Sequence, residues 1–347
     1  MEKSQSDRRL FPIFVREGRS RKRYKSGYID ERGEVVVPPI YDHAHPFRCR
    51  RASVRVGDLW GAIDEQGDLV ISPCSAQALQ FTEGLSEFSS GGRRGVIDME
   101  GNVIVPAIYG SVSHFGDGLA CVRKGNLYGF IDKSGTEVIP PLFDEARAFS
   151  EGLASVKLGN EWGYIGSNGS MAIPPQFICK RGMAGSFRQG LARVSKDGGW
   201  GHINRDAEFV VSPRFDMAYE FSEGLAVVEI NKRKGYVNQQ GDLIIDPVFL
   251  SADQFLGGLA KVRAELEKDA VPKPNEVMCD VGFINSNGEF SISPRFFSAN
   301  RFYYGHSLVE TQKSIGYINR SAEFIWSSGW VDIGLSDPLH LLPPEVS

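Results

Sequence analysis

The chain has 347 residues with a net charge of −4, and its 41% hydrophobic and 24% charged residues exclude a disordered protein. No apolar run reaches the ~18 residues of a membrane-spanning helix, and the N-terminus MEKSQSDRRL lacks the apolar core of a secretory signal, so we expect a cytoplasmic protein that avoids the membrane. The five cysteines are scattered and form no CxxC pair, which argues against a disulfide framework or a zinc site.

The N-terminal part of the chain is basic. Residues 1–60 hold 14 Lys or Arg against 8 Asp or Glu. We interpret residues 1–26 as a basic segment that contains the first strand of the first repeat, residues 10–16. The basic cluster is either a solvated terminal unit or a docking surface for an acidic protein partner or nucleic acid. Nucleic acid is not favoured, because no aromatic residue beyond Tyr24 is interleaved for base stacking. The side chains in question are Arg19, Arg21, Lys22, Arg23, Arg48, Arg50, Arg51 and Arg55.

The strongest feature of the sequence is an internal repeat. A glycine, followed two residues later by Ile or Val, recurs nine times, and six of the eight spacings between copies are 34 residues. The other two spacings, 38 and 47 residues, contain insertions. Such a period is typical of repeat architectures, in which each unit is completed by its neighbours. The units start near Gly27, Gly61, Gly95, Gly129, Gly163, Gly201, Gly235, Gly282 and Gly316.

Each unit is predicted to contain three short strands. In the fifth unit, GLASVKLGNEWGYIGSNGSMAIPPQF, they are residues 153–158, 162–165 and 170–174. A proline ends the third strand because it has no N–H to donate. The Asp or Asn three residues after the repeat glycine should cap the second turn, although the fifth unit has Gly166 there. The last ten or so residues of each unit should cross to the next unit, in one turn of helix.

We therefore expect an all-β array of nine repeats over residues 27–329, followed by a C-terminal cap or tail, residues 330–347. Three strands in about 34 residues favour an open, curved or superhelical stack of three-stranded sheets. The alternative is a closed β-propeller, whose blades usually have four strands in about 40–45 residues.

At these residues the chain resembles the WG-repeat family. Its units carry Trp-Gly, then Asp/Asn-x-x-Gly, Val-Ile-x-Pro and Phe-x-Glu-Gly-Leu-Ala, and the resemblance covers about residues 10–330. It implies a mostly bacterial binding or scaffold module without a shared catalytic activity, and it supplies no catalytic residues. The Trp-Gly dipeptide itself is kept at Trp60–Gly61, Trp162–Gly163 and Trp200–Gly201.

Signals for chemistry are weak. The glycines of GNEWGYIGSNG lie between strands, whereas a P-loop or dinucleotide fingerprint needs a strand followed by a helix. One acidic residue per turn indicates a turn cap, since calcium needs six to eight oxygens. The pair His43-x-His45 lacks a third ligand, so structural or solvent-facing roles are favoured for the histidines. We expect no catalytic residue, no metal and no cofactor.

Two insertions interrupt the period. Four residues are added within CKRGMAGS, residues 179–186, and thirteen within the polar segment 264–278. Each is either a tolerated loop insertion or a recognition loop, because loops on repeat scaffolds often carry recognition. In the longer insertion the candidate contact residues are Glu265, Lys268 and Lys273.

Together these features predict a non-enzymatic scaffold that binds a protein partner through its array surface and inserted loops. The first alternative is an inhibitory or immunity-type subunit of an enzyme or toxin system. The second is a small-ligand-binding protein or an enzyme with a pocket on the array axis.

Overall fold

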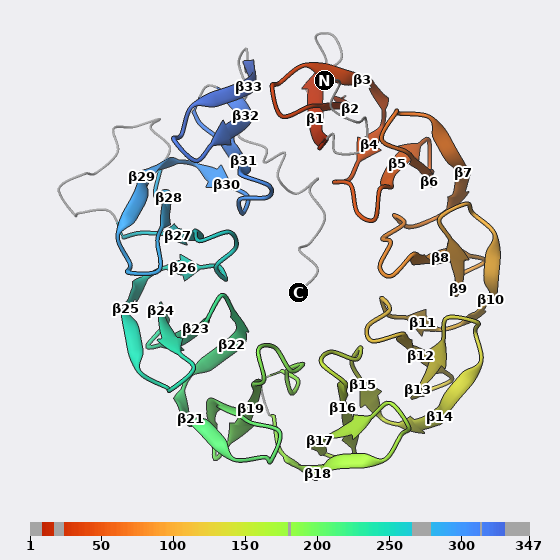
Figure 1. Ribbon diagram of the computed structural model, residues 1–347, viewed down its shortest axis with the longest axis vertical. Helices are drawn as coiled ribbons and strands as arrows, with labels where there is room; N and C mark the ends of the chain where they lie inside the picture. Colours follow the sequence, from red (N-terminus) through yellow and green to blue (C-terminus); the bar gives the residue numbers. More distant parts are fainter. Residues whose placement is uncertain (1–8, 17–23, 180–181, 266–278, 313, 330–347) are drawn as a thin grey trace, which may run out of the picture. The chain divides into compact units, whose positions relative to one another are not determined.

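The computed structural model describes residues 9–16, 24–179, 182–265, 279–312 and 314–329. Over these residues all regular secondary structure is β-strand, and none of them belongs to a helix that could span a bilayer. The strands form nine antiparallel sheets, one for each repeat (Figure 1). Each sheet is called a blade here, and the blades are numbered 1 to 9 along the chain. The described residues up to Leu142 form one compact unit, and those from Phe143 onward form a second.

The first unit holds blades 1 to 4. Within each blade, consecutive strands are hydrogen-bonded neighbours, so every blade is a meander. The strands are β1 (Phe11–Arg16), β2 (Tyr24–Ile29) and β3 (Val35–Tyr41); β4 (His43–Ala44), β5 (Ala52–Val56), β6 (Leu59–Ile63) and β7 (Leu69–Ser75); β8 (Leu85–Ser90), β9 (Arg93–Asp98) and β10 (Val103–Tyr109); and β11 (Ser111–Val112), β12 (Leu119–Lys124), β13 (Leu127–Asp132) and β14 (Glu137–Phe143).

The second unit holds blades 5 to 9, built in the same way. The strands are β15 (Glu145–Ala146), β16 (Leu153–Leu158), β17 (Glu161–Gly166) and β18 (Met171–Phe177); β19 (Ala192–Lys196), β20 (Gly199–Ile203) and β21 (Phe209–Phe215); β22 (Met217–Ser222), β23 (Leu225–Ile230), β24 (Arg233–Asn238) and β25 (Leu243–Phe249); β26 (Ser251–Ala252), β27 (Ala260–Arg263), β28 (Val281–Ile284) and β29 (Phe290–Phe296); and β30 (Ser298–Ala299), β31 (His306–Glu310), β32 (Ser314–Asn319) and β33 (Phe324–Gly329).

The crossing segments differ from the prediction of a helical turn. In six of the nine blades the segment supplies a fourth strand, usually of two residues. In blade 5, for example, Glu145 and Ala146 pair with Lys157 and Val156 of β16. Four-stranded antiparallel sheets in series are the blades of a β-propeller. The preferred open stack of three-stranded sheets is therefore wrong, and the fold is an all-β nine-bladed propeller.

The repeat glycine has a steric role. In blade 5 the last strand, β18, bulges between its pairings Trp162↔Phe177 and Tyr164↔Ile173, and its backbone there crosses close to Gly163. A Cβ on Gly163 would lie 2.5 Å from the Ile173 carbonyl oxygen. At all nine repeat glycines the nearest backbone oxygen would lie 2.2–2.6 Å from such a Cβ. No side chain fits at this position, so glycine is required in every blade.

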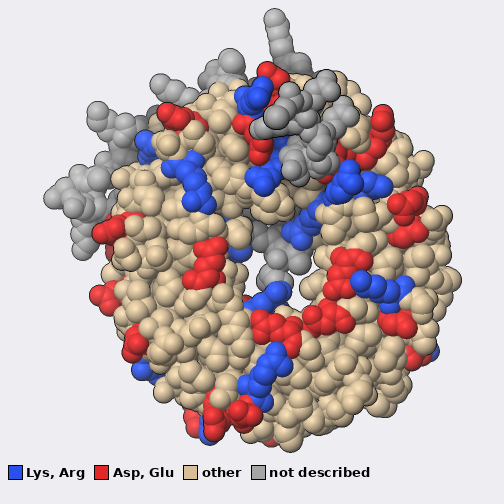
Figure 2. All heavy atoms as spheres, viewed as in Figure 1, with Lys and Arg blue, Asp and Glu red and all other residues tan. Residues whose placement is uncertain are grey.

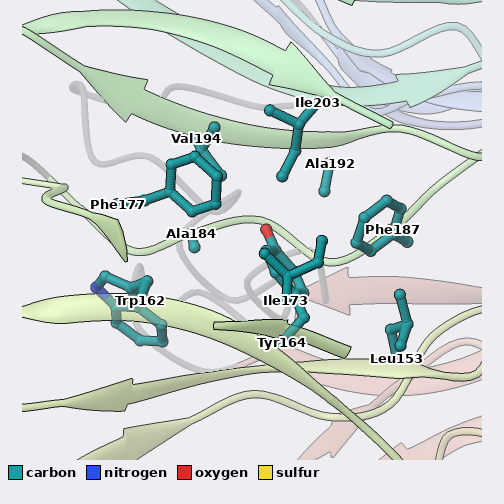
Figure 3. Close-up of a cluster of buried hydrophobic side chains, with 10 residues drawn as sticks. All are labelled: Leu153, Trp162, Tyr164, Ile173, Phe177, Ala184, Phe187, Ala192, Val194 and Ile203. Atoms are coloured by element: carbon teal, nitrogen blue, oxygen red, sulfur yellow. The ribbon is translucent and has the colours of Figure 1, made fainter. Parts of the chain in front are cut away.

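The hydrophobic core lies between consecutive blades of one unit. The cluster in Figure 3 joins Trp162, Tyr164 and Phe177 of blade 5 to Phe187 and Val194, which precede or lie in blade 6. The other described clusters likewise each draw on two successive blades of a unit. A single meander cannot bury both of its faces, so each blade depends on its neighbours, as the repeat predicts.

Candidate functional site

The turn between the last two strands of each blade is capped by the predicted Asp or Asn. In blade 4 the Asp132 Oδ1 atom accepts the backbone N–H groups of Ser134 and Thr136, each at 2.9 Å. Seven other blades repeat this pair of hydrogen bonds. Blade 5 has Gly166 instead, and there Asn168 accepts the Ser170 N–H at 3.0 Å. The acidic residues of these turns are thus caps, as the sequence analysis expected.

A second set of turns carries most of the charged contacts between blades. We call them tip turns: each is a two-residue turn that ends the crossing segment and leads into the next long strand. Both of its central residues have positive φ, as in the hairpin turns that match strand twist. The tip turns of blades 2 to 9 are Cys49–Arg50, Glu83–Gly84, Asp117–Gly118, Glu151–Gly152, Gln189–Gly190, Glu223–Gly224, Gly257–Gly258 and Tyr304–Gly305.

The carboxylate of one tip turn binds the backbone of the next. Glu151 accepts the N–H groups of both Gln189 and Gly190, at 2.6 and 2.9 Å. Glu223 does the same with Gly257 and Gly258, at 2.5 and 2.8 Å. A turn with two positive φ angles points both central N–H groups outward, which makes a small anion-binding concavity. The protein therefore fills these concavities with its own carboxylates.

The same contact recurs with small changes along the row. The Glu83 carboxylate lies 3.2 Å from the Gly118 N–H and 2.8 Å from the ammonium of Lys133. Gln189 uses its carboxamide oxygen to accept the Gly224 N–H at 2.9 Å. We call this series of contacts the tip relay; it runs in one direction, from blades 3, 5, 6 and 7 to the blade that follows each of them.

Blade 2 departs from the tip relay. Its turn reads Arg48-Cys49-Arg50-Arg51, so Cys49 occupies the place of the carboxylate and Arg50 the place of the glycine that every later tip turn has. Arg50 has φ 62°, a left-handed conformation that costs a residue with a Cβ about 1–2 kcal/mol. Cys49 is exposed, and its Sγ lies 3.6 Å from the Phe81 carbonyl oxygen of the next crossing segment. Strain of this kind often accompanies function.

The structure brings three of the sequence-predicted basic residues, Arg48, Arg50 and Arg51, together at this turn. Arg48 is exposed, and its side chain has no hydrogen bond or ion pair to any described residue. Arg50 pairs with Glu65 at 3.0 Å, and Arg51 lies 3.8 Å from Glu100 and donates to the Met99 carbonyl. Arg55 lies away from the turn, opposite His43 of β4, and its Cζ atom stacks 5.9 Å from the centre of the Trp60 ring.

The remaining predicted contact residues are less informative. Arg19, Arg21, Lys22, Arg23, Lys268 and Lys273 lie outside the described residues, as do residues 330–347. Glu265, at the start of the long insertion, is exposed and pairs with Arg233 at 2.6 Å. On the face that Figure 2 shows, acidic and basic side chains are interspersed, so charge is locally balanced over much of it.

A buried ionic cluster in the second unit was not predicted. Glu220 lies between Arg193, at 3.1 Å, and Arg147, at 3.6 Å, and all three side chains are largely buried. Burial alone would raise the pKa of the Glu220 carboxyl, but the two guanidinium groups lower it overall. A Cβ on Gly185 would lie 2.5 Å from Arg193 Cγ, so this glycine of the short insertion makes room for the cluster. The arrangement joins three successive blades and leaves one excess positive charge.

Two of the histidines, His45 and His202, pack against aromatic side chains. His202 of β20 is fully buried, and its Nε2 atom lies 2.7 Å from the Tyr219 carbonyl oxygen. In the matching place, Tyr164 donates its hydroxyl to the Gly185 carbonyl. Burial lowers the pKa of His202 to about 4 and that of His45 to about 3, so both rings are neutral at pH 7. Among the described residues no group of three His, Cys, Asp or Glu could hold a metal ion.

Comparison with solved structures supports the propeller. The chain aligns with a structure described as "Crystal structure of the eukaryotic initiation factor" at TM-score 0.62 and 9% identity, over 93% of this chain and 96% of that one. This structural similarity contradicts the expected open stack of sheets. At 9% identity it is evidence for the fold and not for a function. Apo AztD from Citrobacter koseri aligns over 93% of this chain and 95% of that one, at 11% identity. Its TM-score of 0.45 is too low to support a conclusion about the fold. No curated protein matches the chain.

The repeat also identifies the family. Its sequence profile, described as "WG containing repeat", matches residues 27–60, 60–93, 95–128, 128–162, 162–200, 200–233, 235–265 and 282–312. These segments follow the period set by the repeat glycine and together span most of the chain, so the protein belongs to the WG-containing repeat family.

Proposed function

We propose that this protein is a non-catalytic scaffold that docks an acidic segment of a protein partner at the tip turn of blade 2. The observation that supports the proposal is the reversal of charge at this turn. Four of the other described tip turns carry Glu or Asp, and three carry Gln, Gly or Tyr in that place. Blade 2 instead carries three arginines, of which Arg48 has no partner among the described residues. Arginine is suited to such a role because its guanidinium binds carboxylates in a fixed, bidentate geometry.

The charge around the turn favours an anionic partner. Arg48, Arg50 and Arg51 are opposed there by two carboxylates, those of Glu65 and Glu100. The remaining positive charge is exposed on the side of Arg48, so it can attract and orient a negatively charged surface. Exposed ion pairs such as Arg50–Glu65 contribute little stability, so their partners can be exchanged at small cost.

The test is a binding assay with a defined acidic probe. Fluorescein-labelled hexaglutamate is titrated with the full-length protein in a fluorescence anisotropy experiment at low and high salt. We expect binding that weakens with salt and that falls at least fivefold in Arg48→Glu. Arg188 occupies the matching position before the tip turn of blade 6, so Arg188→Glu is the control and should bind as the wild type does. Equal binding by both variants would refute the proposal.

A further inference from the structure

The tip turn of blade 3, next to Cys49, offers the same pair of backbone donors that carboxylates bind elsewhere in the chain. The central residues of this turn, Glu83 and Gly84, have φ 51° and 85°, close to the values of Gln189 and Gly190. The latter pair binds the Glu151 carboxylate through both N–H groups. The two turns therefore present equivalent donor geometry.

What differs is the residue that the preceding blade supplies. Glu151 and Glu223 each reach across to the following turn, but at the corresponding position blade 2 has Cys49, whose side chain is too short and has no carboxylate. Within the described part of the chain, no acceptor is hydrogen-bonded to the N–H groups of Glu83 or Gly84. The contact from Cys49 Sγ to the Phe81 carbonyl shows that this side chain lies against the segment leading into that turn.

We propose that the Glu83 and Gly84 N–H groups, together with the Arg48 guanidinium, form a binding site for one carboxylate of an acidic protein partner. The partner supplies from outside the group that Glu151 and Glu223 supply within the chain. This inference rests on the proposed function and adds the atoms that receive the partner. Two converging N–H groups hold a carboxylate in one orientation, and arginine adds charge-assisted binding, so the site selects a carboxylate rather than negative charge in general.

The tip turn of blade 8 provides a useful contrast. Gly257 also lacks a carboxylate, but its turn carries no basic side chain, and its carbonyl accepts a hydrogen bond from Arg320 of the next blade. Only at blade 2, among the described tip turns, does loss of the carboxylate coincide with arginines before and after it.

The test supplies the missing acceptor from within the chain. Cys49→Glu should place a carboxylate on the two N–H groups, as Glu151 does, and weaken binding of labelled hexaglutamate at least tenfold. Cys49→Gln fills the site without changing the charge, as Gln189 does for Gly224, and should weaken binding about threefold. Cys49→Ser, which cannot reach, is the control and should stay within twofold of the wild type. In NMR spectra of the wild type, the Glu83 and Gly84 amide signals should move on addition of hexaglutamate.

The outcomes separate this inference from the proposed function. If Cys49→Gln binds as Cys49→Ser does and the two amides do not move, while Arg48→Glu still weakens binding, the carboxylate site is refuted and the docking surface stands. If Arg48→Glu also has no effect, both fail. If inorganic phosphate or a single-stranded oligonucleotide moves the amides and hexaglutamate does not, the partner is not a protein carboxylate and the inference is overturned.

Discussion

Adding one methyl group at the repeat glycine should destabilise the second unit. In Gly163→Ala the new Cβ would lie 2.5 Å from the Ile173 carbonyl oxygen and 2.7 Å from the Pro175 nitrogen, and both are backbone atoms that cannot rotate away. Overpacking of this kind costs about 1–3 kcal/mol. The reduced freedom of the unfolded chain offsets about 0.4–1 kcal/mol of this cost, so we expect a net loss of about 1 kcal/mol.

The same strand provides a matched control. A Cβ on Gly166, three residues along β17, would have no neighbour closer than 3.5 Å, and the φ angle there is not positive. Gly166→Ala should therefore be neutral or stabilising by up to about 1 kcal/mol. In a unit of this size each kcal/mol shifts the melting temperature by about 2–4 °C, so calorimetry should separate the two variants by about 2–8 °C. If Gly163→Ala melts at or above Gly166→Ala, the steric account of the repeat glycine is wrong.

Three further predictions concern contacts between blades. Glu223→Ala removes both hydrogen bonds of one contact in the tip relay and should lower the free energy of unfolding, measured in urea, by about 1 kcal/mol. Glu223→Gln should retain part of this stabilisation, because the carboxamide of Gln189 makes one such hydrogen bond. His202 has a pKa of about 4 in the folded state against ~6.5 unfolded, so it contributes stability that is lost as pH falls from about 6.5 to 4. His202→Tyr, which places there the residue found at Tyr164, should remove this dependence; unfolding free energies of equal slope in both proteins would contradict it. Glu220→Gln should cost about 3 kcal/mol at pH 7 because two guanidinium groups lose their carboxylate. The pKa of Glu220 is lowered in the folded state, so the wild type loses this stabilisation as pH falls through that pKa. The unfolding free energies of the wild type and of Glu220→Gln should therefore converge in acid. A difference between them that stays constant with pH would contradict an ionic origin.

The long strands and their turns could be read from the sequence because their signals are local. Residues 153–158 alternate in a way that predicts a strand, and β16 has these bounds. The Asx caps follow from an Asp or Asn that reaches backbone N–H groups two and four residues later. The two-residue first strands of five blades could not be read in this way. Two residues such as Glu145 and Ala146 are too few to show alternation, and their pairing with β16 decides their conformation.

The contacts between blades were hidden for a different reason. Arg147, Arg193 and Glu220 are far apart in the chain, and only the packing of three successive blades brings them together. The sequence showed that Cys49 and Arg50 depart from the repeat, but the meaning of the replaced residue depends on the contact that Glu151 makes in another blade. A departure from a repeat becomes interpretable only when the structure shows what the common residue does.

The one-way tip relay bears on how such a chain can change its length. The repeat of blade 7 brings one carboxylate for the blade that follows and N–H groups for the blade that precedes, as Glu223 and Gly224 show. Duplicating or deleting such a whole repeat keeps the carboxylate acceptors and the N–H donors equal in number. A duplication or deletion that begins inside a repeat leaves one acceptor or one donor without its partner. Tandem duplication of one full repeat at a time therefore lengthens the chain without leaving these hydrogen-bonding groups unpaired. Blade 2, whose tip turn carries Cys49 in place of a carboxylate, interrupts that succession.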